Sequence, residues 1–448
     1  MLPLRNTTIM KKTVLIFFLV IKVHSQTEFT LQQCIDYTLK NNPSLFVQQN
    51  NVAIAKEKSW QTLSEYLPQI SGTATVQNNL QLQTSVLPAG VLGPNPSEIT
   101  FGTKYNTNAV VDVKQILYDQ SKITGIKANK SYTQISLLQQ KQNQELLIYN
   151  TGTAYYQVLI YREKLQILRA NKEKYEQMVK VLQYQHEKGT ILEKDVDRVR
   201  VNLNTTNYQI DDSQTKEILA VNILKNAMGM PMGESLNIVP TMNYELLAIG
   251  SFNDNLILNN LTEVQINEQS LELQKYSLKV KQASYLPTLS AVGRFGQQAL
   301  NDDFSNSFNN WSAFSYVGLS LNVPIFSGFK RKSEVQEEKL KLKNEQLNFT
   351  INKESLTLRY DNAKTSMGTA YSSYLSNKDN MLLAKKLLDV TDYQYQRGVT
   401  NLTDYLNDDL AYKESQSNYI SSLYNLMISQ MDYQKSRGSL LDFMSQIR

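Results

Sequence analysis

Cysteine, proline, glycine and long apolar runs are all scarce in this 448-residue sequence. The single cysteine, Cys34, excludes a disulfide-stapled fold and a cysteine-based zinc site. Ten prolines and 17 glycines leave little turn chemistry for many short elements, so long helices are expected. Beyond the N-terminus, no window approaches the ~20 apolar residues of a transmembrane helix. We also expect no tightly packed globular core, because aliphatic residues rarely run together.

Residues 1–25 have the layout of a secretory signal peptide. Two lysines precede an apolar run, Thr13–Ile21, that is too short to cross a bilayer, and the small residues Val23 and Ser25 suit cleavage. A buried N-terminal helix is the alternative. Cleavage removes four of the 46 basic residues and leaves 42 against 41 acidic ones, so no electrostatic case exists for a nucleic-acid partner. Cys34 lies well past the apolar run, which disfavours a lipid-anchored N-terminus.

One order of landmarks occurs twice along the chain. Tyr66-Leu67-Pro68 recurs as Tyr285-Leu286-Pro287, each closing a polar helical stretch, and Gly189 and Gly398 interrupt helices in matching contexts. These landmarks predict two structural repeats. The expected division is a signal peptide at 1–25, repeat 1 at 26–230, a linker at 231–252 and repeat 2 at 253–448.

The hydrophobic pattern changes to alternation between each Leu-Pro pair and the next long helix. Leu319 and Leu321 alternate with small or polar residues, which is a strand pattern of period two. Weak alternation of this kind is typical of transmembrane barrel strands. We therefore expect two β-hairpins, with strands within 69–117 around a loop at 87–97, and within 288–327 around a loop at 301–311.

The expected helices fall into two lengths. Two stretches of 69 residues, Ser121–Gly189 and Lys330–Gly398, each span about 100 Å at the α-helical rise. Two shorter helices laid end to end match one long helix, because the return helices span about 55–60 Å and the helices before the strands about 45–55 Å. These shorter helices are Ile191–Met228, Leu402–Leu441, Leu31–Tyr66 and Asn255–Tyr285.

A narrow apolar stripe follows the helices. Val196, Val199 and Leu203, like Leu402 and Tyr405, step by three or four residues, which is the seam of a coiled coil. The rest of each helix is polar and needs water on at least one broad side. Long antiparallel coiled-coil hairpins are therefore expected, and an ordinary solvated coiled coil is the alternative.

The two glycines mark the tips of these hairpins. Lys188 and Arg397 place positive charge at a helix C-terminus, and the following glycine suits a left-handed cap. Thr190–Glu193 fits a capping box for the return helix, and Asn401–Asp404 is a weaker analogue.

Four strands cannot close a membrane barrel, because the smallest single-chain barrels use eight. An open sheet edge in lipid leaves backbone groups unsatisfied. Three copies supply twelve strands, whereas two copies give a barrel too narrow for an open lumen. A homotrimer is therefore the expected assembly.

The doubled order resembles the TolC-type outer membrane efflux family. The resemblance rests on Leu31–Pro43, both Leu-Pro landmarks, Val323–Gly328 and the two tips. It implies a mainly α chain with a β-barrel part, in which four strands per chain contribute to a trimeric 12-stranded outer membrane barrel on a periplasmic α-helical tunnel. It also implies three partners: a periplasmic adaptor protein, an inner-membrane pump of RND or ABC type, and outer membrane lipid.

The expected function is passive conduction of exported substrates through the outer membrane, in tripartite efflux or type I secretion. An exported coiled-coil scaffold or adhesin without a pore is the alternative, and the four strands disfavour it. Catalysis and cofactors are not expected, because His186 is the only histidine beyond the leader and no nucleotide-binding or nucleophile motif accompanies it.

The family resemblance also suggests site residues at the tips. Tyr395, Gly398 and Asp404 match in the second tip, and Gly189 and Asp195 in the first; Thr400, Asn407 and Lys194 depart from the family pattern. We expect an aperture ring of Asp195, Asp404 and Asp408, with aperture contacts from Tyr395, Thr400 and Lys194. First-turn aspartates that complement a helix N-terminus are the simpler alternative. The expected adaptor-docking residues are Lys188, Gly189, Thr190, Arg397, Gly398 and Val399.

Overall fold

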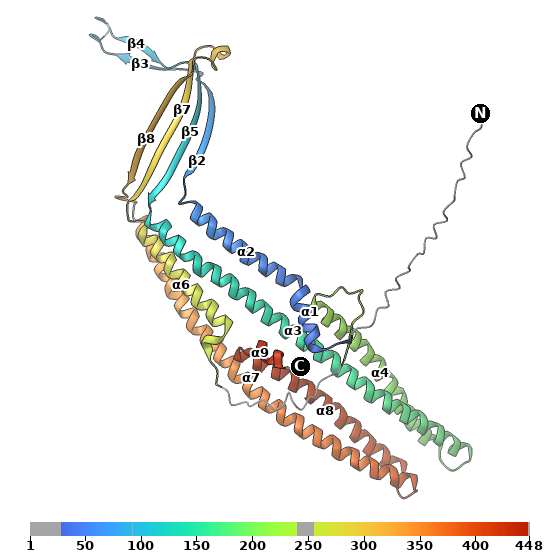
Figure 1. Cartoon of the computed structure of the whole chain (residues 1–448). Helices are drawn as coiled ribbons and strands as arrows, with labels where there is room; N and C mark the ends of the chain where they lie inside the picture. Colours follow the sequence, from blue (N-terminus) through green and yellow to red (C-terminus); the bar gives the residue numbers. More distant parts are fainter. Residues whose placement is uncertain (1–27, 92, 240–254, 447–448) are drawn as a thin grey trace, which may run out of the picture.

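The computed structural model describes residues 28–91, 93–239 and 255–446. The predicted signal peptide and much of the predicted linker lie outside these ranges. The molecule is elongated, with a four-stranded sheet at one end of a layer of long helices and two helix hairpins at the other end (Figure 1).

The order helix, strand pair, long helix and shorter return helix occurs in both halves of the chain. The first half comprises α1 (Leu31–Asn41), α2 (Pro43–Ser64), β2 (Gln69–Asn78), β5 (Tyr105–Tyr118), α3 (Gln120–Glu187) and α4 (Glu193–Met228). The second half comprises α6 (Thr262–Ala283), β7 (Thr288–Asn301), β8 (Ser312–Asn322), α7 (Lys330–Gln396) and α8 (Leu402–Arg437). A short helix, α9 (Leu440–Gln446), follows, and two single 3-10 turns lie at Leu258–Asn260 and Phe304–Asn306.

The first predicted helix is two helices. Thr30 and Gln33 form a reciprocal capping box that starts α1. At Asn42 the backbone is extended, its side chain accepts a hydrogen bond from the Ser44 amide at 2.9 Å, and Pro43 occupies the first turn of α2. Proline has no amide hydrogen to continue α1 but suits the first turn of a new helix, so the chain restarts there.

The four long strands form one antiparallel sheet in the order β2-β5-β7-β8. The two hairpins predicted from the sequence are thus joined by pairing between β5 and β7. β8 ends at Asn322, before the end of the expected range at 327. Pro324 cannot donate a ladder hydrogen bond, which explains why the strand stops before it.

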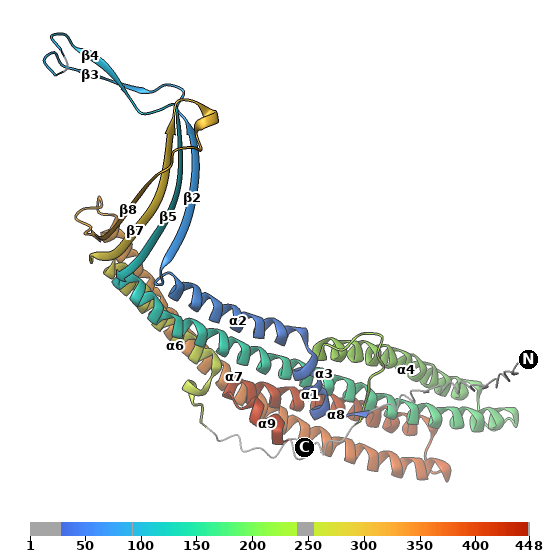
Figure 2. The same cartoon turned by 45° about the horizontal axis from the view of Figure 1, so that its top comes forward.

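Two small β-elements were not predicted. β3 (Gln83–Leu87) pairs with β4 (Ser97–Phe101) and forms a further hairpin that projects beyond the sheet (Figure 2), and its strands flank the loop expected at 87–97. β1 (Glu28–Phe29) pairs in parallel with β6 (Asn237–Ile238), which lies inside the predicted linker. Strands of two residues carry too little pattern to be recognised in a sequence.

The helices form one layer with a consistent order. Next to the sheet the order is α2, α3, α6 and α7, and toward the tips it is α4, α3, α8 and α7. The shorter helices α2 and α4 thus lie along successive parts of α3, and α6 and α8 along α7. The layer thus has the arrangement expected from the helix lengths, in which two shorter helices laid end to end match one long helix.

The expectation of no packed core is wrong for the middle of the layer. A buried cluster there draws side chains from both halves, and its largest members are aromatic and sulfur-containing residues rather than aliphatic runs. Fully or almost fully buried members include Tyr155, Tyr156, Met228, Met367, Met431 and Tyr433. These bulky side chains let a sequence with few aliphatic runs exclude water locally.

Cys34 lies on the buried face of α1 within this cluster and is fully shielded from solvent. Burial raises the pKa of its thiol to about 12. We predict that Cys34 in the folded protein does not react with N-ethylmaleimide at pH 8, because the reactive species is the thiolate. Mass spectrometry should show one adduct only after denaturation. A Lys188→Cys/Cys34→Ala variant, with its thiol at an exposed tip, should react without denaturation; rapid labelling of native Cys34 would contradict the prediction.

Candidate functional site

The sheet separates apolar from polar side chains across its two faces. In antiparallel pairs, directly opposed residues share a face, so the register assigns every position. Val111 opposes Gly72 on β2 and Phe295 on β7, and Gly293 opposes Val317 on β8. Following these pairs gives a mainly apolar face that includes Ile70, Gly72, Ala74, Val76, Ala109, Val111, Val113, Leu289, Ala291, Gly293, Phe295, Val317, Leu319 and Leu321. Four polar residues lie on the same face: Thr107, Gln115, Gln297 and Ser315.

The opposite face is polar and carries an ion pair. Arg294 Nε and Nη2 donate to Asp112 Oδ1 and Oδ2 at 2.6 and 3.1 Å, a bidentate arrangement. The Arg294 guanidinium also lies 6.0 Å from the centre of the Tyr316 ring. The remaining side chains of this face are mostly amides and hydroxyls, such as Gln69, Ser71, Thr73, Asn108, Gln298 and Ser320.

Both outer edges of the sheet are open. Among the described residues, β2 and β8 each pair on one side only, and every residue of β2 is exposed. The apolar face is exposed as well: Ile70 retains 70% and Val317 91% of its accessible surface. A single chain thus presents a bare apolar surface bounded by two rows of unpaired backbone groups.

The two tips share one turn geometry. Gly189 and Gly398 have φ angles of 73° and 72°, in the left-handed region that favours glycine. The amide of Thr190 donates to Gln185 O at 3.0 Å, and that of Val399 to Gln394 O at 2.9 Å. Both turns are Schellman motifs, as the glycine positions predicted.

Of the two N-terminal caps predicted for the return helices, the stronger candidate does not form and the weaker one does. Leu192 begins α4 without any side-chain cap, because the Thr190 hydroxyl already donates to Gln185 O of the preceding helix at 2.8 Å. The capping box predicted for Thr190–Glu193 is therefore wrong. Asn401, the weaker candidate, does cap α8, since its Oδ1 accepts from the Asp404 amide at 2.9 Å.

The three aspartates of the predicted ring are each engaged within their own hairpin. Asp195 lies 3.6 Å from Arg198, and Asp404 accepts from the Thr400 hydroxyl at 3.0 Å as well as from the Asn401 amide group. Asp408 accepts from the Thr391 hydroxyl of α7. Asp404 is exposed, whereas Asp195 and Asp408 are half-buried.

Of the predicted aperture contacts, Tyr395 lies at the boundary between the two halves. Its ring stacks on Tyr405 at 5.4 Å between centroids. Burial, followed by the negative charge of Asp195 from the other half, raises the pKa of Tyr395. Thr400 bonds within its own tip, and Lys194 is exposed. The proposed docking residues Lys188 and Arg397 are also exposed, each with its charge over a tyrosine of the same helix, Tyr184 or Tyr393.

Sequence reasoning missed a buried polar contact between the halves, which we term the inter-half clamp (Lys174, Tyr175 and Asp409). Asp409 of α8 is only 2% exposed, accepts from Lys174 Nζ at 2.8 Å, and accepts from the Tyr175 hydroxyl. Burial alone would lower the pKa of Lys174, but the charge of Asp409 and the hydrogen bond to it raise the pKa above its ordinary value. Closer to the tips, Arg198 Nη1 donates to the Thr403 hydroxyl at 2.9 Å.

The sequence did contain a signal for Asp409. The residues Leu402, Tyr405, Asp409, Tyr412, Gln416, Tyr419, Leu423 and Leu426 step by three and four without interruption. Asp409 and Gln416 thus occupy seam positions that are expected to be apolar, and both are buried. A polar residue at a seam position costs stability and usually specifies a particular partner.

Two features are absent from the described part of the chain. None of its helices has the length and apolar character needed to cross a bilayer. No cluster of three or more histidine, cysteine or acidic side chains there is arranged to hold a metal ion.

This arrangement of an amphipathic sheet on a layer of long helices is the fold of solved outer membrane channels. The chain superposes on CusC with a TM-score of 0.77, at 15% identity over 92% of both chains. It superposes on the CmeC outer membrane channel of Campylobacter jejuni with a TM-score of 0.74, at 18% identity over 93% of this chain and 89% of that one.

The sequence comparisons define the family. The profile described as outer membrane efflux protein matches residues 34–230 and 255–438, and the chain belongs to this family. The outer membrane protein TolC of Escherichia coli K12 is 24% identical over 75% of this chain and 70% of its own length. The alkaline protease secretion protein AprF of Pseudomonas aeruginosa is 24% identical over 42% of this chain and 39% of its own. The resemblance deduced from the sequence is confirmed.

We predict that Asp409→Asn loosens the contact between the halves, because it leaves the Lys174 charge without its partner. Lys174 is about one-third exposed, so the loss is smaller than for a fully buried pair, about 1.4 kcal/mol or tenfold faster amide exchange in peptides covering 170–180. Hydrogen–deuterium exchange with mass spectrometry measures this. Since the fold raises the pKa of Lys174, the pair persists up to its ordinary value of 10.5 and is lost as the pH rises further.

The matched control is Asp408→Asn, because Asp408 bonds to Thr391 within the second half alone. It should leave exchange in the first-half peptide 170–180 unchanged. Equal exchange in the Asp409→Asn variant and the unmodified protein would show that the clamp does not hold the halves together.

Proposed function

We propose that the chain is one protomer of a homotrimeric outer membrane channel that passively conducts exported substrates from a periplasm-spanning pump to the exterior. The observation that carries this proposal is the sheet with one mainly apolar face and two unpaired edges. Such a sheet is stable in lipid only when the edges close on one another, because no water is available there to satisfy them.

The number of copies follows from the strand count. A heterologous contact between β8 of one copy and β2 of the next uses both edges and closes a ring. Three copies give a 12-stranded barrel with the apolar face toward lipid, and the Asp112–Arg294 face toward the lumen. Two copies give an eight-stranded barrel, and the interior of such a barrel is filled by side chains.

The helical layer supports the same closure. Leu340, Leu347, Ile351 and Leu358 of the edge helix α7 are exposed at intervals of seven, four and seven residues. We term them the α7 stripe. The opposite edge carries its own exposed apolar residues, which are Phe46, Val47, Ile54 and Trp60 on α2 and Val201, Tyr208, Leu219 and Ile223 on α4. Packing one edge on the other buries both in a tunnel wall.

The tips are the proposed contact with partners. A signal peptide, a barrel in the outer membrane and helices on one side of it direct the tips into the periplasm. Lys188, Gly189 and Thr190, with Arg397, Gly398 and Val399, lie at the far ends of the hairpins, where a periplasmic adaptor and a pump of RND or ABC type would dock. Two relatives are consistent with this placement, since TolC is an outer membrane protein and AprF is an alkaline protease secretion protein.

The alternative, a scaffold or adhesin without a pore, explains the hairpins but not the sheet. A soluble scaffold gains nothing from fourteen aligned apolar or glycine positions facing water. A scaffold should extract from membranes with urea, whereas a barrel needs detergent.

We predict that Leu347→Glu/Ile351→Glu abolishes the trimer, because it places like charges at the centre of the α7 stripe. The unmodified protein should migrate as a heat-modifiable trimer on detergent gels, and the variant as a monomer. Gln346→Glu/Thr350→Glu, two exposed positions of the same stretch off the stripe, serves as the matched control and should remain trimeric. A monomer that conducts ions when reconstituted alone would refute the proposed assembly.

The proposed aperture ring rests on Asp404, with Asp195 and Asp408 behind it. Three copies of an exposed carboxylate at a constriction favour cations. We predict that Asp404→Asn lowers the cation selectivity of the reconstituted channel, most clearly at or below 0.1 M salt, where screening extends about 10 Å. Planar-bilayer reversal potentials measure this. Asp392→Asn is the control, since Asp392 bonds to Gln396 on the same helix. An unchanged selectivity in Asp404→Asn would leave that residue only as a first-turn aspartate that complements the N-terminus of α8.

A further inference from the structure

The loop between β8 and α7 carries large apolar side chains that the chain leaves exposed. Figure 2 shows this loop projecting from the junction of the sheet with the helices. Ile325 keeps 93% and Phe329 67% of its accessible surface, and Phe326 is exposed as well. Phe329 has a φ of 64°, in a region that bulky residues rarely adopt, and its ring contacts that of Phe326 edge to face at 5.5 Å between centroids. A conformation of this kind often marks a functional surface.

Three consecutive basic residues follow the loop. Lys330, Arg331 and Lys332 lie in the first turn of α7, and none of them is in an ion pair within the described part of the chain. Glu334, the next acid along the helix, pairs with Lys281 of α6 at 3.6 Å. Positive charge at the start of a helix opposes the helix dipole, so these side chains do not stabilise α7.

The corresponding junction of the first half is neutralised within the chain. Asp119 accepts hydrogen bonds from the amides of Ser121 and Lys122 at the start of α3, at 2.9 and 3.2 Å. Lys122 in turn pairs with Glu65, just after α2. The unpaired cations thus distinguish the β8–α7 junction from the β5–α3 junction. We term the exposed apolar and basic residues of the β8–α7 junction the junction patch (Ile325, Phe326, Phe329, Lys330, Arg331 and Lys332).

The junction patch lies at one end of the mainly apolar face of the sheet. Leu321, the last apolar position of β8, is in register with Leu289 of β7, and Leu289 with Tyr118 of β5. At the other end of β5, the Tyr105 ring packs on Phe304 at 5.4 Å between centroids. The residues from Tyr105 to Tyr118 span about 43 Å along the strand, or about 30–35 Å along the axis of a barrel whose strands tilt by 35–45°. This height accommodates an apolar band of about 25 Å with an aromatic girdle at each end.

In the proposed barrel, the junction patch therefore lies at the boundary between the periplasmic leaflet and water. A phospholipid there offers acyl chains to the apolar side chains and a phosphate to the basic ones. The neighbouring copy offers less, because the acid that precedes its β2 is Glu65, which already pairs with Lys122. An anionic headgroup fits best, because a zwitterionic headgroup carries a positive charge of its own.

We propose that the junction patch binds anionic phospholipid of the periplasmic leaflet, with Lys330, Arg331 and Lys332 at the headgroup and Phe326 and Phe329 among the acyl chains. This inference rests on the proposed function, because the barrel places the patch at the membrane boundary. It adds a preference for one class of lipid to that function. In a trimer, three such patches surround the barrel at one leaflet and fix its depth in the membrane.

The test is native mass spectrometry of the purified protein in detergent, titrated with dioleoyl-phosphatidylglycerol or dioleoyl-phosphatidylcholine. The two lipids share their acyl chains and phosphate and differ in the net charge of the headgroup. We expect the unmodified protein to bind phosphatidylglycerol about tenfold more tightly, because each Lys or Arg near an anionic lipid adds affinity.

The triple variant Lys330→Gln/Arg331→Gln/Lys332→Gln should bind both lipids equally, within about twofold. The matched control is Lys180→Gln/Lys385→Gln/Lys386→Gln, which removes three exposed charges from the helices toward the tips and should keep the preference. Phe326→Ala/Phe329→Gly should weaken both lipids to the same extent, and glycine suits the φ of position 329.

Three results would overturn the proposal: equal binding of the two lipids by the unmodified protein, a preference that survives in the Lys330/Arg331/Lys332 variant, or a preference that the control variant loses. Conversion of the Lys330/Arg331/Lys332 variant into monomers would also overturn it, because the cluster would then belong to a contact between copies. Circular dichroism verifies folding, and if that variant does not fold, the unmodified protein and the control variant still decide.

The mass of the complex reports the assembly separately from the bound lipid. A trimer of the unmodified protein without a lipid preference defeats this inference alone. A monomeric unmodified protein defeats the proposed channel, and with it the placement of the junction patch at the membrane boundary.

Discussion

The backbone groups at the two edges of the sheet are the constraint on which the proposed assembly depends. β2 and β8 are each paired on one side only within the described chain, and the face between them is apolar. In lipid these groups have no partner except another copy, so the strand count sets the number of copies. The chain connects the helices to the strands so that both follow the same order across the molecule. α2 leads into β2 and β8 leads into α7, so the helices at the two edges of the layer continue from the strands at the two edges of the sheet.

Much of this architecture could be predicted because its causes are local. The long helices, the left-handed glycines at 189 and 398, and the four main strands each follow from residues within one turn or one strand. The errors have local causes as well. Asn42 and Pro43 end one helix and start another, and Thr190 cannot cap α4 while its hydroxyl bonds to the helix before it. These competing hydrogen bonds become visible only when both candidate partners are placed in space.

The inter-half clamp could not be predicted, because its partners are too far apart in the sequence. Lys174 and Asp409 are separated by 235 residues, and no local pattern connects them. Asp409 and Gln416 occupy seam positions of α8, and a polar residue at such a position indicates a polar partner on the facing helix. The two residues differ in whether they have such a partner. Asp409 contacts an ammonium group and a hydroxyl group of the other half, whereas Gln416 Oε1 is buried without a hydrogen-bond partner among the described residues.

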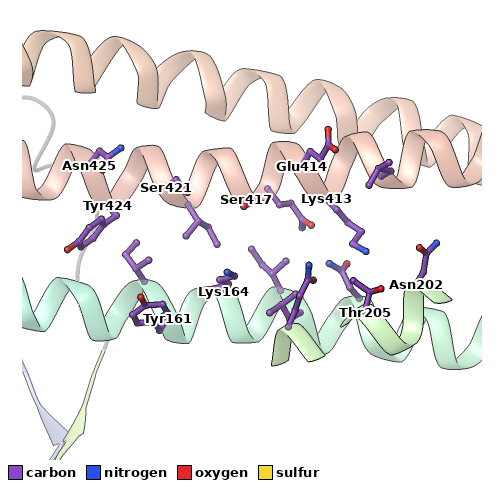
Figure 3. Close-up of a pocket in the computed structure, with 18 of the residues that line it drawn as sticks. Tyr161, Lys164, Asn202, Thr205, Lys413, Glu414, Ser417, Ser421, Tyr424 and Asn425 are labelled. Carbon is purple, nitrogen blue, oxygen red and sulfur yellow. The ribbon is translucent and has the colours of Figure 1, made fainter. Parts of the chain in front are cut away.

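The distribution of buried clusters along the layer shows where the halves can separate. The central cluster contains residues of α3, α7 and α8, and the tip cluster contains Tyr175 and Val199 from the first half with Leu388 and Tyr405 from the second. Between these two clusters, the buried cluster of Leu165, Leu168 and Ile210 belongs to α3 and α4 alone. At this level Tyr161 of α3 and Tyr424 of α8 line a cavity of about 650 Å³ between the halves (Figure 3). The halves are thus joined by apolar packing in the middle and at the tips, and by few contacts in between. A separation of the two tips would therefore break the tip cluster, the clamp and the Arg198–Thr403 hydrogen bond, while the central core and the sheet would still join the halves.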